Sequence, residues 1–281
     1  SSARVNKLEK DGRCWMVIGQ GPGGAGFRYC CDNLFVGCGA INTPALLSRN
    51  GIGRNVGKTL KMHPSIKVIA KFGERLNFPG VGVPVHQVKE FSPEIGFGCS
   101  ISSKEYIAAG LIDYPTKIKS IDADWPYMAS YYAMTTGGNG RIFNLPGMRD
   151  PVVTYKLNDE SLITLATGVK KLCKLLFRAG AKELYPSISN LQPLVREVDI
   201  DSIPNLLSRA NTNLMTIHLM GSCPMGEDLT SCAVDSFGKV HGEDNLFLAD
   251  ASILCTALGY NPQGTMMAIV RRNTLKFLEK F

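Results

Sequence analysis

The sequence lacks several features that would assign it at once to a class of protein. Its 281 residues carry a net charge of +7, but the lysines are scattered and form no dense basic block interleaved with aromatic residues. We interpret them as a solvated surface and expect no nucleic-acid partner. No apolar run approaches the roughly 20 residues that a membrane-spanning helix needs, so no membrane span is expected.

Metal-binding and disulfide patterns are also missing. The nine cysteines are odd in number and include no C-x-x-C pair, and Cys30 and Cys31 are direct neighbours. We therefore predict free thiols, no disulfide and no metal site. The first ten residues lack the apolar core of a signal peptide, which predicts a cytoplasmic protein.

The N-terminal part of the chain contains a hairpin signal and a glycine-rich segment. Residues 4–18 are expected to form a hairpin around Asp11-Gly12, a strong two-residue turn. The segment GQGPGGAG (19–26) superficially matches a dinucleotide-binding loop. Such a loop needs a following helix of several turns, and the residues that follow here are typical of an extended segment. We therefore favour a flexible turn.

An α/β pattern comes next. NLFVGCG (33–39) is a short apolar run ending in glycine, which is typical of a buried parallel strand. A helix is expected to follow, with Thr43 as its cap, Pro44 in its first position and Gly51 at its end.

From about Ser65 the pattern changes to extended segments separated by turns, which indicates a mainly antiparallel sheet. One amphipathic helix near 159–179 interrupts them, with Asn158 as its cap and Gly180 at its end. The expected strands cover residues 65–72, 86–91, 95–102, 140–145 and 151–157.

The apolar, glycine-punctuated α/β pattern returns after about Met215. The chain therefore leaves one domain, builds a second and comes back. We predict a discontinuous α/β domain of residues 1–64 and 215–281, with an inserted antiparallel domain of residues 65–214.

The most informative residues lie in the last quarter of the chain. His218 stands in an apolar setting before a glycine-rich loop, and a strand over 246–249 leads into Asp250 and two small residues. Small residues at the carboxyl end of a strand let the backbone approach a ligand. Taken singly, these features have ordinary explanations, a core histidine and a strand exit.

A C-terminal helix is expected over 263–281, with Asn261 as its cap and Pro262 as its first residue. Its N-terminus would offer unpaired N–H groups to an anion, although a capped terminal helix needs no such ligand. Several apolar residues of the helix are available for burial: Met266, Met267, Ile269, Val270, Leu275, Phe277 and Leu278.

Two longer blocks resemble the glucose–methanol–choline (GMC) flavin oxidoreductases. GAINTPALLSRNGIG (39–53) is similar to the second signature of that family, with Asn50 where the family has serine, and NVGKTLKMHP follows it. IHLMGSCPMG, VHGEDNLFLADAS and NPQGTMMAI are similar to the family's C-terminal blocks, with Ser222 in place of the usual threonine. The resemblance covers most of the chain.

The resemblance implies a fold and a cofactor. The fold would be a partial FAD-binding Rossmann-like domain with an inserted antiparallel substrate domain. Asp250 and Ala251 would face the pyrophosphate and ribityl chain of FAD, and Asn261, Pro262 and Thr265 would lie at the flavin ring.

The same resemblance implies alcohol oxidation. His218 would take the hydroxyl proton, a task that suits a histidine titrating near neutrality. Asn261 would donate a hydrogen bond to the developing alkoxide while the carbon's hydride passes to flavin N5. A sugar-like or aminocyclitol hydroxyl is the expected substrate.

The chain departs from the family at its start, because the family begins with a G-x-G-x-x-G segment that binds the ADP half of FAD. We therefore expect a partner, either an N-terminal ADP-binding segment of the same gene product or a second chain. Two alternatives stay open: a non-catalytic subunit with the same fold, and a hydroxynitrile lyase on the same scaffold.

Overall fold

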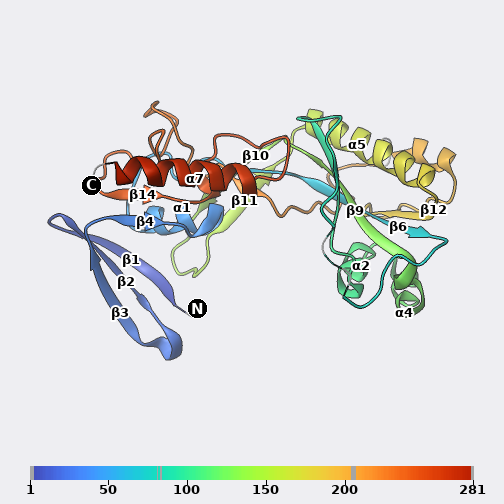
Figure 1. The fold of residues 1–281 in the computed structure, drawn as a ribbon, viewed down its shortest axis with the longest axis horizontal. Coiled ribbons are helices and arrows are strands. Elements are labelled where there is room, and N and C mark those ends of the chain that lie inside the picture. The colour runs from blue at the N-terminus through green and yellow to red at the C-terminus, as the bar shows by residue number, and fades with distance from the viewer. Residues whose placement is uncertain (1–2, 81, 83, 204–206, 280–281) are drawn as a thin grey trace.

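The computed structural model describes residues 3–80, 82, 84–203 and 207–279 (Figure 1). The chain begins with an antiparallel three-stranded sheet in the order β1-β2-β3, formed by β1 (Arg4–Asp11), β2 (Cys14–Gln20) and β3 (Gly26–Cys31). The predicted hairpin is confirmed, and Gly12 adopts a φ of 59°, which suits a glycine in a tight turn. Of the segment 19–26, residues 21–25 connect β2 to β3, and the segment leads into a strand, not a helix of several turns.

Two short strands far apart in sequence pair in parallel. β4 (Leu34–Val36) and β14 (Leu246–Leu248) align with Leu34 opposite Leu246, so both strands end at the same edge. The parallel strand predicted after the hairpin is therefore confirmed, but its predicted burial holds only for Val36, since Phe35 is 41% exposed. Its hydrogen-bonded neighbour lies in the last part of the chain.

Helix α1 (Gly39–Arg49) starts earlier than the sequence suggested. Thr43 therefore lies inside the helix and is not its cap. Its hydroxyl accepts a hydrogen bond from the Cys38 N–H and donates one to Asp250. Pro44 is also internal and has no N–H to donate to the Ala40 carbonyl. The Ser222 hydroxyl bonds that carbonyl instead, at 2.6 Å. The predicted end at Gly51 is confirmed.

The strands β12-β6-β9-β8-β7 form, in this order, a five-stranded antiparallel sheet. Three of its strands match predicted extended segments, whereas β9 and β12 were not predicted. Its strands are β6 (Ser65–Phe72), β7 (Gln87–Val88), β8 (Ile95–Cys99), β9 (Met128–Thr135) and β12 (Ala181–Pro186).

Helices cover both faces of this sheet (Figure 1). Helix α5 (Asp159–Arg178) packs on one face, where Leu165 and Leu172 join the apolar side chains of β6 and β8. The predicted cap is confirmed, since Asn158 Oδ1 accepts a hydrogen bond from Ser161 N. Three short helices that the sequence did not predict lie on the other face: α2 (Lys104–Gly110), α3 (Pro115–Ile118) and α4 (Ile121–Asp124).

The strands predicted over 140–145 and 151–157 form a separate ribbon of β10 (Asn139–Phe143) and β11 (Val152–Lys156). This ribbon packs near α1, where Asn144 Nδ2 donates to the Ala45 carbonyl. The short elements β5 (Lys61–Met62) and β13 (Leu219–Met220) pair with each other beside it. The division into residues 1–64 with 215–281 and residues 65–214 stays a prediction.

The C-terminal helix α7 (Gln263–Leu278) lies along β4 and β14 (Figure 1). Pro262, not Asn261, occupies the N-cap position, so the predicted cap is wrong by one residue. The expected burial is also wrong for Met267, Leu275 and Leu278, which are 48–59% exposed. Phe277 packs its ring against Phe35 of β4 and Phe247 of β14, and Ile269 packs against the same apolar cluster. In the part of the chain that the structure describes, no helix is long and apolar enough to cross a membrane.

Candidate active site

His218 and Asn261 line one cavity of 270 Å³, here named the His218 cavity. His218 immediately precedes β13, and Asn261 lies two residues before α7. Strands β6 and β9 supply further walls through Lys67 and Tyr132. The two residues that the sequence assigned to catalysis therefore meet in space, at the junction between the large sheet and the C-terminal segment.

A second histidine orients His218. His63 is fully buried, and its Nδ1 lies 3.0 Å from Nδ1 of His218. His63 Nε2 lies in hydrogen-bond contact with the carbonyl oxygen of Leu258. A carbonyl oxygen only accepts, so His63 Nε2 must carry a proton.

This contact fixes the tautomer of both neutral rings. With its proton on Nε2, His63 accepts at Nδ1, and His218 must donate from its own Nδ1. His218 Nε2 is then unprotonated and has no hydrogen-bond partner among the described residues. The pair thus leaves one basic nitrogen of His218 free for a ligand in the His218 cavity.

Burial and the neighbouring His63 lower the pKa of His218 to about 4, and burial also lowers the pKa of His63. The expectation of a histidine titrating near neutrality is therefore wrong in this structure. The cause is that a half-buried imidazole loses hydration that would stabilise its charged form. His218 is neutral at pH 7, which is the form that accepts a proton.

Asn261 lies beside Tyr132 of β9 on the wall of the His218 cavity. Burial raises the pKa of the Tyr132 phenol, and the neighbouring side-chain amides of Gln87 and Asn261 partly offset the rise. Since Asn261 does not cap α7, its amide stays on the cavity wall.

Asp250 does not present its carboxylate to open space. One oxygen accepts hydrogen bonds from the Gly39 N–H at 2.9 Å and the Thr43 hydroxyl, and the other accepts from the Ser252 N–H at 2.8 Å. The side chain is buried and joins the end of β14 to the start of α1. It therefore positions the adjacent backbone at Ala251, which is partly exposed.

The remaining cofactor candidates lie at the start of α7. Pro262 is buried and Thr265 is partly exposed in the first turn. Gly264 lies in the same turn, and a Cβ added there would meet no atom within 4 Å. The same holds for Gly39 at the start of α1, so both helices begin beside open, side-chain-free backbone.

Comparison with known proteins identifies the family. Residues 145–269 match the family model described as GMC oxidoreductase. An uncharacterised GMC-type oxidoreductase of Sinorhizobium fredii is 38% identical over 276 residues, which are 96% of this chain and 55% of that protein. The chain belongs to the GMC oxidoreductase family.

Two further matches concern proteins with named activities. A long-chain-alcohol oxidase of Arabidopsis thaliana is 29% identical over 269 residues, 83% of this chain and 35% of that protein. The crystal structure of pyridoxine 4-oxidase from Mesorbium loti has a TM-score of 0.71 at 17% identity, covering 99% of this chain and 57% of that chain. The last likeness confirms the predicted fold class. The chain spans about half the length of the first curated relatives, 55% and 43%.

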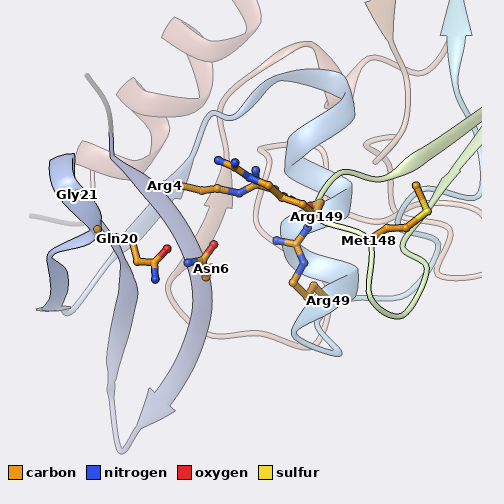
Figure 2. A pocket seen from close by; sticks show the side chains of 8 residues that line it. Arg4, Asn6, Gln20, Gly21, Arg49, Met148 and Arg149 are labelled. Atoms are coloured by element: carbon orange, nitrogen blue, oxygen red, sulfur yellow. Dashed lines mark hydrogen bonds between the residues drawn. The ribbon is translucent and has the colours of Figure 1, made fainter.

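A larger cavity of 610 Å³ lies elsewhere on this GMC chain, between the three-stranded sheet and α1. Figure 2 shows the side chains of Arg4, Arg49 and Arg149 gathered at it. Arginine stays protonated in proteins and cannot take a proton from an alcohol. Asp150 also pairs with Arg4, at 3.1 Å. The smaller His218 cavity is therefore the better candidate for chemistry.

Sequence reasoning missed three residues of the site. His63 stands in the NVGKTLKMHP block, whose resemblance to the family gave a signal that was not converted into a role. Lys67 interrupts the apolar run of β6, and a charge within a buried strand is a second usable signal. Tyr132 lies on β9, a strand that was itself not predicted, so nothing in the sequence pointed to it.

All nine cysteines are free in the structure, including Cys30 and Cys31. Among the described residues, no group of His, Cys, Asp and Glu side chains is arranged to hold a metal ion. The polar groups available for chemistry at the His218 cavity therefore include the imidazole of His218, the amide of Asn261 and the ammonium group of Lys67.

Proposed function

We propose that the complete protein oxidises an alcohol with FAD, and that His218 is the base. The observation that carries this proposal is the His63–His218 contact, because it leaves His218 Nε2 unprotonated on a cavity that also holds Asn261. A general base has to present a free lone pair to the proton that it removes.

His218, Asn261 and His63 have different roles in this proposal. The substrate hydroxyl binds between His218 and Asn261, and His218 Nε2 accepts its proton. The Asn261 amide donates a hydrogen bond to the oxygen, which gains negative charge as the proton leaves. His63 keeps the donor proton of His218 on Nδ1, away from the substrate.

Bound FAD would supply the hydride acceptor that the oxidation of the alcohol to a carbonyl requires. The residues present fit such a group. The ends of β4 and β14 meet at one edge, and α1 and α7 begin with the open backbone of Gly39 and Gly264. Helix N-termini of this kind attract anionic groups. Ala251, Pro262 and Thr265 would hold the cofactor, with Asp250 acting through its contacts to α1.

A partner is part of the proposal. The 281 residues cover the part of the family's length that carries His218 and Asn261, and we propose that an N-terminal ADP-binding segment or a second chain supplies the rest of the FAD site. A sugar-like or aminocyclitol alcohol and a cytoplasmic location also stay predictions.

Anaerobic stopped-flow spectroscopy of the complete, FAD-loaded protein tests the function. Benzyl alcohol, 1-octanol, glucose and an aminocyclitol serve as probes, and bleaching of the flavin with formation of the matching carbonyl is the expected result with at least one of them. A flavin that no alcohol reduces would contradict the proposal. Release of cyanide from mandelonitrile without flavin reduction would favour the lyase alternative.

A further inference from the structure

Lys67 is an unusual residue for its position in the fold. It lies in β6 between Ile66 and Val68, which are both fully buried, and its own side chain is only 9% exposed. A Cβ added to Gly110 of α2 would lie 3.7 Å from Lys67 Cδ, so the aliphatic stem passes close under that helix. Its ammonium group lies 5.5 Å from the ring centroid of Tyr106, and both residues line the His218 cavity.

The ammonium group has no acidic partner among the described residues. Lys71, four positions further along the same strand, pairs with Asp124 at 2.7 Å and with Glu183 at 3.9 Å. The ammonium group of Lys67 lies over the ring of Tyr106 instead, and burial lowers the pKa of Lys67. A buried charge without a counter-ion is costly, so a residue kept in this state points to a ligand that supplies the opposite charge.

The rest of the His218 cavity carries no compensating charge. Its described walls contain no Asp or Glu, and His218 is neutral at pH 7. Apolar side chains of Ile101, Met215 and Ile217 contribute much of the remaining lining. The cavity therefore combines one cation, an apolar middle and the hydroxyl-binding pair of His218 and Asn261.

We propose that Lys67 recognises an anionic group, a carboxylate or a phosphate, on the alcohol that binds between His218 and Asn261. This inference rests on the proposed function and makes the substrate a small acidic alcohol. The cavity volume of 270 Å³ suits a small molecule. An aminocyclitol is disfavoured, because its ammonium groups would meet Lys67 across a cavity with no carboxylate.

The test uses three probes of the same shape and different charge: 4-(hydroxymethyl)benzoate, 4-(hydroxymethyl)benzamide and 4-(hydroxymethyl)benzylamine. We expect the complete protein to oxidise the benzoate with a kcat/KM at least roughly tenfold above the amide, the scale of one charge-assisted hydrogen bond. The benzylamine should be poorest. Lys67→Met keeps the aliphatic stem and should reduce the benzoate-to-amide ratio to about one, whereas Lys67→Arg should retain most of it.

Lys71→Met is the matched control, because it removes a lysine from the same strand outside the cavity and should leave the ratio unchanged. Equal kcat/KM for benzoate and amide in the unmodified protein would overturn the inference while leaving alcohol oxidation intact. An unchanged ratio in folded Lys67→Met would overturn it as well.

Equilibrium dialysis of 4-(hydroxymethyl)benzoate separates this inference from the proposed function. Lys67-dependent binding without flavin reduction would support the anion site and refute the oxidation. Binding that Lys67→Met and Lys67→Arg weaken equally, compared with the unmodified protein, would refute a role for the charge. Inorganic phosphate and benzoate are then compared as competitors of the bound alcohol. Competition by phosphate but not by benzoate would assign the site to a phosphate group.

Discussion

Two amphipathic helices of this chain end in different surroundings. Helix α5 buries eight of its 20 residues against the five-stranded sheet, whereas α7 buries only Asn273 among its 16 residues. Both helices carry enough apolar residues for a core. The difference is what lies opposite them, because α5 covers a wide sheet and α7 covers only the pair β4–β14.

The two regions differ in how much apolar surface they leave exposed: the apolar face of α5 is covered, whereas apolar side chains of α7 stay exposed. The sheet β12-β6-β9-β8-β7 has helices on both faces, and its strands supply walls of the His218 cavity. The region around α7 exposes Met267 and Leu275 on the surface of that helix. His218 and Asn261 lie where these two regions meet, so substitutions can address each region separately.

The largest effect is expected at the junction. His218→Ala should lower the rate of flavin reduction in the complete protein by roughly 10²–10⁴ fold, the usual scale for a general base. Stopped-flow reduction by the best alcohol probe measures it. His86→Ala, which changes an exposed histidine outside the cavity lining, serves as the control and should leave the rate unaltered. An unaltered rate in His218→Ala would refute the assignment.

The closed region should respond strongly to core truncation. Leu165→Ala removes a fully buried side chain from the face of α5 that packs on the sheet and should lower the free energy of unfolding by about 2–5 kcal/mol. Chemical denaturation monitored by circular dichroism measures the loss. Ile163→Ala on the same helix, where the side chain is 68% exposed, should change stability by about 0.5 kcal/mol or less. Similar losses for both variants would show that α5 packs differently.

The open region gives the sharpest test of the comparison. If a partner segment covers α7 in the complete protein, Leu275→Glu buries a charge and should destabilise it by about 2 kcal/mol or more, with loss of bound FAD. Ile163→Glu on α5 is the matched control and should have little effect. Thermal melting and FAD content of the complete protein provide the measurement. Equal, small effects would indicate that the outer face of α7 stays in solvent.

A smaller effect is expected from His63, which acts through His218. His63→Ala should slow flavin reduction by on the order of 10 to 10² fold, the scale for residues that orient a reactive group through a hydrogen bond. His63→Gln should restore part of the rate, because its amide can donate to the Leu258 carbonyl and accept from His218.

The pH profile distinguishes positioning from a structural role. His218 must be neutral to act, so kcat/KM should hold at neutral pH and fall only as the pH drops through about 4, the lowered pKa of His218. Because His63 contributes to that lowering, His63→Ala should move the acid limb upward, toward the ordinary histidine value. An acid limb at the same pH in both proteins would contradict the role of His63.

Local patterns determined much of the fold. The Asp11-Gly12 hairpin, the parallel strand β4 and the cap of α5 at Asn158 follow from residues close together in sequence, so their physics can be read from the chain alone. Strand β9 lies at the centre of the large sheet, yet it was not predicted. Its side chains on both faces are covered by segments distant in sequence, so no alternation of polar and apolar residues marks it.

The resemblance of sequence blocks determined the family and nominated His218 and Asn261, but tertiary structure decided their chemistry. Helix α1 starts at Gly39 and not after Thr43 as predicted. Asp250, more than 200 residues away, accepts hydrogen bonds from both Gly39 and Thr43. His63 fixes the tautomer of His218 across a separation of 155 residues, and burial removes the charge that a free histidine would gain near neutrality. Long-range hydrogen bonds and desolvation depend on which segments meet, and a sequence records neither until the chain has folded.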